Sequence, residues 1–445
     1  MVVETASTNI EKYKRILFVY DRLDIIGGLE TRWMDEFSYL KKNNYQVFLL
    51  IPKLRFNPKI AELFSIHKFI TIDISNIDTV INFVKLVNQF IETIQTEDIQ
   101  VLSIHMLDIF ACAAVMAAQI CKIPVISTTH GILDIYRTPV ERILIQHLAS
   151  KSFSLSVSVS KTFKSITPSI SCKKTVIPNL INLNKYQHQF SDCKPAWLII
   201  NRISPEKFPS ILRFLETTEQ CHINEVDIAG GGEKRELEKL IKSLNLKVKV
   251  NFLGEVKDIA RLIPQYSGVA GMGRVAIEGL ACKKPVCIIS IDGKLIGLVT
   301  TENFQHLKSY NFTGKGLTPI ENERILRQLE THSPKDTEDL YSLLENELSV
   351  DNWNNYINLY NNVTFIDNQA IESLYHKLSY FSTTLTTPFI NDNFFQHLLY
   401  ETLIEYNLHE AQKMWQYYET SLGLTNSYPS PYSNKNLKKK LKWWK

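Results

Sequence analysis

Short apolar runs alternate with helical segments along most of the chain, and this alternation restricts the fold more than any other feature. The first run, RILFVY at 15–20, is the kind of continuous apolar segment that forms a buried strand. A glycine turn and a helix with one apolar face follow it, and QVFLLIP comes next. Because strands that alternate with helices form parallel sheets covered on both faces, we expect such a sheet here. Further strand-like runs lie at 69–74, 100–105, 123–130 and 153–160.

A second series of the same kind begins with AWLIINR at 196–202. It continues through EVDIAGGG, KVNFLG and PVCIIS, again with glycine turns between strands and helices. Two doubly wound units in one chain place a ligand cleft between them, at the carboxyl ends of both sets of strands. The predicted fold class is therefore α/β, with two Rossmann-like parallel-sheet domains that face a cleft.

The domain boundaries follow from these two series. We expect an N-terminal Rossmann-like domain over 1–188, a C-terminal one over 189–318, and a helical extension over 319–445. The chain of 445 residues is long enough for two or three cores. With 44% apolar and 22% charged residues the composition is that of a soluble globular protein, and a net charge of +4 does not indicate nucleic-acid binding.

Cysteine usage and the terminal segments bear on metal binding and location. The seven cysteines include no C-x-x-C pair and no His cluster has metal spacing, so we predict reduced thiols and no metal site. The start of the chain lacks a signal-peptide core, and the longest apolar run, 109–120, is too short to span a membrane. We expect a cytoplasmic protein. The tail 434–445 carries six lysines and two tryptophans, which suits either peripheral contact with an anionic membrane or a disordered solubilising tail.

One candidate site follows the first strand of the first unit, in DIIGGLETRW. Gly27 and Gly28 allow close approach of a ligand to the backbone, and Glu30 lies at the start of the following helix. Paired glycines are also common in ordinary turns, so phosphate or acceptor binding and a plain turn both stay open.

The corresponding position of the second unit is NRISPEK. Arg202 and Lys207 follow the strand directly, and two fixed cations can neutralise a diphosphate. The alternative is a solvated loop with two surface cations. The position after the first strand of the unit favours the diphosphate.

Two further glycine turns belong to the second unit. In IAGGGEKRELEKL, Gly230 and Gly231 open a helix, either for phosphate contact or simply for a tight connection. In GMGRVAIEGLACKKPV the helix start would attract an anion, and a glutamate inside its first turns would suit a hydroxylated part of the same ligand. The alternative is that this glutamate is exposed on the surface. The candidates in this segment are Gly271, Gly273, Arg274 and Glu278.

In their order and spacing, these segments resemble the GT-B glycosyltransferases, specifically the retaining enzymes of glycosyltransferase family 4. The resemblance covers roughly residues 14–315 and includes STTHG and VIPNLINLNKY, with Leu180 in place of the usual glycine. It implies that Arg202 and Lys207 bind the donor diphosphate and stabilise the leaving group. It also implies that Glu278 accepts hydrogen bonds from the donor ribose.

The resemblance assigns roles to the remaining candidates as well. Gly271 and Gly273 would lie near the phosphates and the donor sugar, and Gly28 would let the backbone approach phosphate or acceptor. His130 would reach the transferred sugar; from the residues alone, a buried histidine with its hydrogen bonds satisfied is as good an interpretation.

One position departs from the family pattern. Ala270 stands where the first glutamate of the E-x7-E motif is expected. This leaves recognition of the donor sugar open. Arg274 would either compensate for the missing glutamate or favour a donor with an anionic sugar.

The resulting prediction is a hexosyltransferase-type glycosyltransferase. It would move a sugar from a nucleotide-diphosphate sugar to a glycan or lipid-linked acceptor, in the synthesis of bacterial lipopolysaccharide or capsule. Retention of configuration is implied by the resemblance, and no D-x-D motif stands at a suitable strand end, which agrees with a reaction that needs no metal or cofactor. The alternatives are a catalytically silent GT-B-like subunit that partners another transferase and, ranked lower, an epimerase or phosphorylase on the same fold. The donor base, sugar, acceptor, linkage and oligomeric state stay open.

Overall fold

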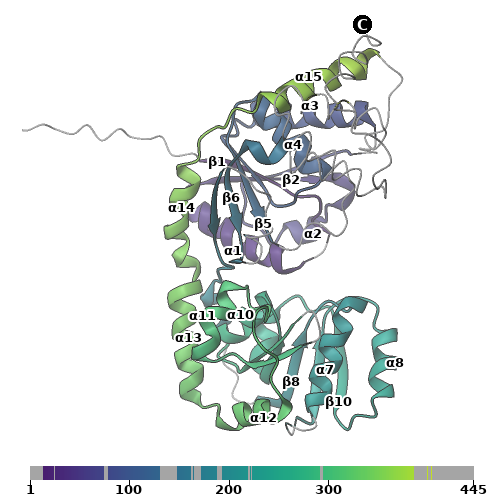
Figure 1. Ribbon diagram of the computed structural model, residues 1–445, viewed down its shortest axis with the longest axis vertical. Helices are drawn as coiled ribbons and strands as arrows, with labels where there is room; N and C mark the ends of the chain where they lie inside the picture. Colours follow the sequence, from purple (N-terminus) through teal and green to yellow (C-terminus); the bar gives the residue numbers. More distant parts are fainter. Residues whose placement is uncertain are drawn as a thin grey trace, which may run out of the picture.

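The computed structural model describes residues 14–384, except 25, 75–78, 131–147, 162–163, 165–171, 188–192, 219–220, 222 and 291–293, together with residues 398 and 402. The predicted tail at 434–445 lies outside the described residues. The chain forms two α/β domains, one above the other in Figure 1. The predicted fold class is confirmed.

The first domain is built on a seven-stranded sheet in which every pair of neighbouring strands is parallel. Its strand order is β3-β2-β1-β4-β5-β6-β7, so the chain reverses its direction of winding between β1 and β4. Ligands bind outside the carboxyl ends of the strands at such a switch point. The strands are β1 (Arg15–Val19), β2 (Gln46–Pro52), β3 (Lys68–Ile72), β4 (Val101–Ile104), β5 (Val125–Thr129), β6 (Phe153–Ser158) and β7 (Lys173–Val176).

Helices pack on this sheet through apolar side chains that are almost fully buried. The Ala-rich helix α4 (Ile109–Ile120) has nearly every residue buried, as expected of a helix packed between a sheet and other helices. Asp108 accepts a hydrogen bond from the backbone N–H of Ala111 and so caps this helix. The other helices of the domain are α1 (Gly28–Lys42), α2 (Pro58–Ala61) and α3 (Val80–Thr96).

The second domain has a six-stranded sheet with the order β10-β9-β8-β11-β12-β13, and its switch point lies between β8 and β11. All pairs are parallel except β12 with β13. The strands are β8 (Lys194–Ile200), β9 (Glu225–Ala229), β10 (Lys249–Gly254), β11 (Tyr266–Gly271), β12 (Val286–Ile289) and β13 (Leu295–Leu298). The helices are α7 (Phe208–Thr218), α8 (Arg235–Ser243), α9 (Ile259–Leu262), α10 (Arg274–Ala281) and α11 (Thr301–Ser309).

The helices predicted after residue 318 pack on both domains. Helix α12 (Asn322–Thr331) contacts β13, and α13 (Pro334–Leu348) contacts α10 and α11. Helices α13 and α14 (Asn354–Asn361) then follow one side of the molecule from the lower domain to the upper (Figure 1). Helix α15 (Gln369–Thr384) packs against α3 and α4. The described part of the predicted extension therefore ties the two domains together.

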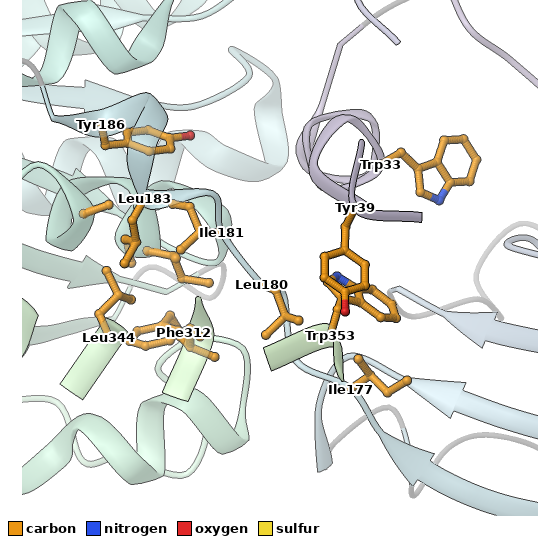
Figure 2. Close-up of a cluster of buried hydrophobic side chains, with 14 of the residues drawn as sticks. Trp33, Tyr39, Ile177, Leu180, Ile181, Leu183, Tyr186, Phe312, Leu344 and Trp353 are labelled. Atoms are coloured by element: carbon orange, nitrogen blue, oxygen red, sulfur yellow. The ribbon is translucent and has the colours of Figure 1, made fainter. Parts of the chain in front are cut away.

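A continuous apolar cluster fills the junction between the domains (Figure 2). The chain passes from the first domain to the second through residues 177–186 and returns near residue 350, and the two crossings lie side by side. Ile181 donates a backbone hydrogen bond to the carbonyl of Leu348 at 2.8 Å and accepts one from Val350 at 2.9 Å. Trp353 stacks on Tyr39 of α1, with ring centroids 6.4 Å apart. The orientation of the domains is therefore supported by packing as well as by the linker.

In the described residues, no helix is long and apolar enough to cross a membrane.

Candidate functional site

The predicted site residues lie at or after the carboxyl ends of the strands of both sheets. In the first domain these ends carry Gly27, Gly28 and Glu30 after β1, and His130 after β5. In the second domain they carry Arg202 and Lys207 after β8, the Gly230 turn after β9, and the segment from Gly271, the last residue of β11, to Glu278. Because parallel strands end at one edge of a sheet, each set was brought together by topology.

Glu30 is used by its own helix. The backbone N–H of Gly27 donates to Glu30 Oε2 at 2.8 Å, and the carboxylate is almost fully buried. Burial raises the pKa of Glu30 above its ordinary value, although the hydrogen bonds from the backbone oppose this. The structure thus gives Glu30 a helix-capping contact, and its predicted contact with phosphate or acceptor stays a prediction.

Gly28 brings the two domains into close contact. A methyl group added at Gly28 would lie 3.7 Å from Cβ of Arg274, so the start of α1 faces the start of α10. The α10 start depends on Gly273, whose φ of +61° falls in the region that favours glycine. The backbone N–H of Gly273 donates to the carbonyl of Phe312 at 3.1 Å. Two of the predicted glycine sites are therefore neighbours across the domain junction.

Arg274 is buried at this contact and has a partner on each side. Its guanidinium forms an ion pair with Asp35 of α1, and it donates to the carbonyl of Leu180 at 2.6 Å. Its Nε donates to Glu278 Oε1 at 3.3 Å. The guanidinium of Arg274 therefore contacts the first domain, the linker and its own helix, and it joins the two domains.

Glu278 is also buried and accepts a hydrogen bond from Tyr186 Oη at 3.1 Å. Burial raises the pKa of Glu278, while Arg274 and Tyr186 act in the opposite direction. The alternative of a surface-exposed Glu278 is wrong. Tyr186 and Arg274 both bond to Oε1 of Glu278, and the predicted contact of this carboxylate with a donor ribose stays a prediction.

Ala270 lies inside the core of the second domain. It is fully buried in β11, paired with Ile199 of β8 and Cys287 of β12. A glutamate at this position would place a carboxylate among apolar side chains in the present arrangement. The apolar surroundings of position 270 therefore suit the alanine that stands in place of the family's glutamate.

The loop that carries Arg202 is held by the glycine turn after β9. A methyl group at Gly230 would lie only 1.8 Å from the carbonyl oxygen of Asn201, so this close approach requires glycine. The backbone N–H of Ile203 donates to the carbonyl of Gly231 at 2.8 Å. Arg202 itself is exposed and Lys207 half-buried. The Gly230 turn thus fixes the backbone on both sides of Arg202.

A cavity of about 530 Å³ opens beside this loop. Residues after β9 and at the end of β10 line it, including Gly231, Phe252 and Glu255. Lys234 lies over the ring of Phe252, 5.6 Å from its centroid. The sequence analysis assigned no role to Lys234, Phe252 or Glu255, although Phe252 belongs to the quoted segment KVNFLG. Their position at a strand end was the available signal.

His130 lies next to a second histidine. His105 follows β4 directly, and its Nδ1 is 2.8 Å from Nε2 of His130. Desolvation lowers the pKa of both rings well below the ordinary value, and the nearby charge of Arg32 adds to this. Their surroundings therefore favour the neutral form of both imidazoles. His105 was missed in the sequence, although it ends the predicted strand QVLSIH at the edge where the rule on strand ends applies.

Among the residues that the structure describes, no group of three or more His, Cys, Asp or Glu side chains could hold a metal ion.

Comparison with known proteins agrees with this arrangement. The sequence model of Glycosyltransferase Family 4 matches residues 26–185, and that of Glycosyl transferases group 1 matches residues 182–302. The first match covers β2 to β7 of the first domain, and the second covers β8 to β13 of the second. No curated protein sequence matches the chain.

Solved structures share the fold at low sequence identity. A glycosyltransferase from Rickettsia africae is 17% identical with a TM-score of 0.60, over 79% of this chain and 98% of that one. The lipopolysaccharide outer core galactosyltransferase WaaB is 15% identical with a TM-score of 0.51, over 78% and 99%. A mutant of S. aureus TarM in complex with fondaparinux, α-GlcNAc-glycerol and UDP is 9% identical with a TM-score of 0.53, over 78% and 100%.

Proposed function

The chain is a GT-B glycosyltransferase of the family 4 type, and on that premise we propose that it transfers a sugar from a nucleotide-diphosphate sugar to a glycan or lipid-linked acceptor. The observation that carries the proposal is the Arg202 loop, fixed by the Gly230 turn beside a cavity of about 530 Å³. The nucleoside would enter this cavity. The diphosphate would lie at Arg202 and Lys207, toward the first domain.

The chemistry follows from where charge develops. Breaking the bond between sugar and phosphate leaves negative charge on the departing diphosphate. Fixed cations and backbone N–H groups that are already in place stabilise this charge without reorganisation. Arg202 and Lys207 would supply the cations, and the N–H groups at the start of α10 would lie nearby. We propose that this reaction retains the anomeric configuration and needs no metal.

The acceptor class is proposed by analogy. WaaB acts in the lipopolysaccharide outer core, and TarM was crystallised with a GlcNAc-glycerol. Both support an acceptor that is part of a bacterial surface polysaccharide. The enzyme itself would be cytoplasmic. The tail 434–445, which lies outside the described residues, would add peripheral contact with an anionic membrane.

A catalytically silent binding subunit is the second candidate, because two observations favour it. Ala270 is buried in the core, and Glu278 is bonded to Tyr186 and Arg274. Such a subunit would bind a nucleotide and a partner but transfer no sugar.

The test is a nucleotide panel followed by an activity measurement. UDP, GDP, ADP and CMP would be added to the purified protein with and without Mg²⁺, and the melting temperature recorded, because a ligand that binds only the folded state stabilises it. We expect stabilisation by one nucleotide and no requirement for Mg²⁺. The matching nucleotide sugar is then assayed for transfer or slow hydrolysis. Binding without either reaction would favour the silent subunit, and the absence of any binding at millimolar concentration would contradict both candidates.

A further inference from the structure

Two buried polar side chains and one partly buried histidine form a hydrogen-bonded row in the first domain. Ser103 lies in β4, His105 follows that strand, and His130 follows the neighbouring parallel strand β5. Ser103 Oγ is 3.0 Å from His105 Nε2, and His105 Nδ1 is 2.8 Å from His130 Nε2. Both ring nitrogens of His105 are therefore engaged. His130 stands at the partly exposed end of the row.

The packing holds His105 in one orientation. Its ring stacks on Phe18 with centroids 5.1 Å apart and meets Trp33 edge-on at 4.9 Å. The ring of His130 lies within 20° of parallel to it, with centroids 5.1 Å apart, and is joined to it by the hydrogen bond at Nδ1. A ring enclosed in this way cannot exchange its two nitrogens by rotation without opening the core.

Ser103 sets the direction of the hydrogen bonds. Its side chain is fully buried, and in the described part of the chain its hydroxyl has His105 Nε2 as its hydrogen-bond partner. The hydroxyl must donate, because the opposite direction would leave its proton buried without an acceptor, at a cost of about 1–3 kcal/mol. His105 then carries its proton on Nδ1 and donates to His130 Nε2.

The consequence falls on His130. Its Nε2 accepts from His105, so its own proton is on Nδ1. No described residue accepts a hydrogen bond from that Nδ1–H. A second proton on either ring would place a positive charge in a desolvated site near Arg32.

We propose that Ser103 and His105 are positioning residues that fix His130 as a neutral donor, whose Nδ1–H bonds to an oxygen of the transferred sugar. The contact between His130 and the sugar rests on the proposed function. The assignment of the protons to particular ring nitrogens of His105 and His130 does not depend on it. It assigns His130 the role of orienting the sugar and excludes it as a general base through Nε2.

The first experiment reads the tautomer directly. With ¹⁵N-labelled histidine, long-range proton–nitrogen spectra distinguish a ring protonated on Nδ1 from one protonated on Nε2, and His130→Asn identifies the His130 signals among the eleven histidines. We expect the Nδ1–H form for His130 in the unmodified protein. The Nε2–H form would overturn the proposal, whether or not any sugar is transferred.

The second experiment compares two variants of nearly equal size. In His105→Asn the amide N–H can replace Nδ1–H, whereas His105→Leu has no donor. We expect His105→Leu to lower kcat for sugar transfer by roughly 10- to 100-fold. Binding of the nucleoside diphosphate should change by less than about two-fold, because that ligand lacks the transferred sugar that His130 would contact. His105→Asn should retain most of the activity and the Nδ1–H signal of His130.

Equal loss of activity in His105→Asn and His105→Leu would overturn the proposal, since it would show that only the imidazole volume matters. Failure of the proposed function gives a different result. The unmodified protein would then bind no nucleotide and transfer no sugar, while the spectra would still show which nitrogen of His130 carries the proton.

Discussion

Arg274 of the second domain forms a buried ion pair with Asp35 of the first. Asp35 also accepts from Lys185 of the linker at 2.6 Å, and Arg274 donates to the linker carbonyl of Leu180. The charges of Arg274, Asp35 and Lys185 therefore join both domains and the segment between them. This network favours one relative orientation of the two domains.

We expect Arg274→Met to destabilise the protein by about 3–5 kcal/mol, because it leaves the buried carboxylates of Asp35 and Glu278 short of a cation. Urea unfolding at neutral pH measures the effect. Arg261→Met is the matched control, since Arg261 pairs with Asp258 on the surface, where an ion pair contributes about 0–1 kcal/mol. Equal stability of the two variants would show that the interdomain pair contributes no more than a surface pair.

A second prediction concerns pH. Burial lowers the pKa of His105 and His130 well below 6.5, so the unfolded chain binds protons below that pH that the folded protein does not. The contribution of these histidines to stability is therefore complete above pH 6.5 and is lost as the pH falls, by up to about 1.4 kcal/mol per pH unit for each ring.

Denaturant unfolding between pH 7.5 and 5 would check this. The loss of stability with falling pH should be shallower in the double variant His105→Asn/His130→Asn than in the unmodified protein. The raised pKa values of Glu30 and Glu278 act in the opposite direction, but they are present in both proteins and cancel in the comparison. Parallel curves would contradict neutral histidines in the folded state.

The alternation of strands and helices was enough to predict both sheets, because a buried parallel strand has to be apolar along its whole length. The same reasoning placed Arg202 and His130 at strand ends, and it would have placed His105 there had it been applied to QVLSIH. The local sequence is enough to place a residue at a strand end, because that position depends only on one strand and the turn after it.

The pairing of Arg274 with Asp35 could not be predicted in the same way. The two residues are 239 positions apart, and their contact depends on how the domains are oriented. An arginine at the start of a helix gives no sign in the sequence of a partner in another domain. The sequence analysis therefore considered Arg274 only for recognition of the donor sugar. Likewise, the helical pattern after residue 318 does not indicate which domain each helix covers.

A third prediction separates two adjacent glycines. Gly230→Ala should force apart the loops after β8 and β9, because the added methyl would lie 1.8 Å from the carbonyl oxygen of Asn201. Overpacking of this kind costs about 1–3 kcal/mol or more, and it would also displace Arg202. Gly231→Ala is the control, with no atom closer than 3.8 Å to the added methyl. Unfolding and nucleotide binding should both be impaired in the first variant, whereas the stability of the second should stay near that of the unmodified protein. Similar stabilities would show that the turn relaxes easily.

The last prediction tests the cations directly. Hydrogen bonds to charged groups contribute about 1.5–3 kcal/mol, so Arg202→Ala should weaken binding of the preferred nucleoside diphosphate by roughly 10- to 150-fold. Binding of the corresponding nucleoside should be unchanged, because it has no phosphate to contact Arg202. Calorimetric titration of both ligands measures the two effects. Arg213→Ala serves as control for the loss of one positive charge, since Arg213 is exposed on α7 and pairs with Glu216. If Arg202→Ala weakened binding of the nucleoside and of the nucleoside diphosphate equally, Arg202 would contact the base. If Arg202→Ala and Arg213→Ala weakened diphosphate binding equally, Arg202 would act only through its long-range charge.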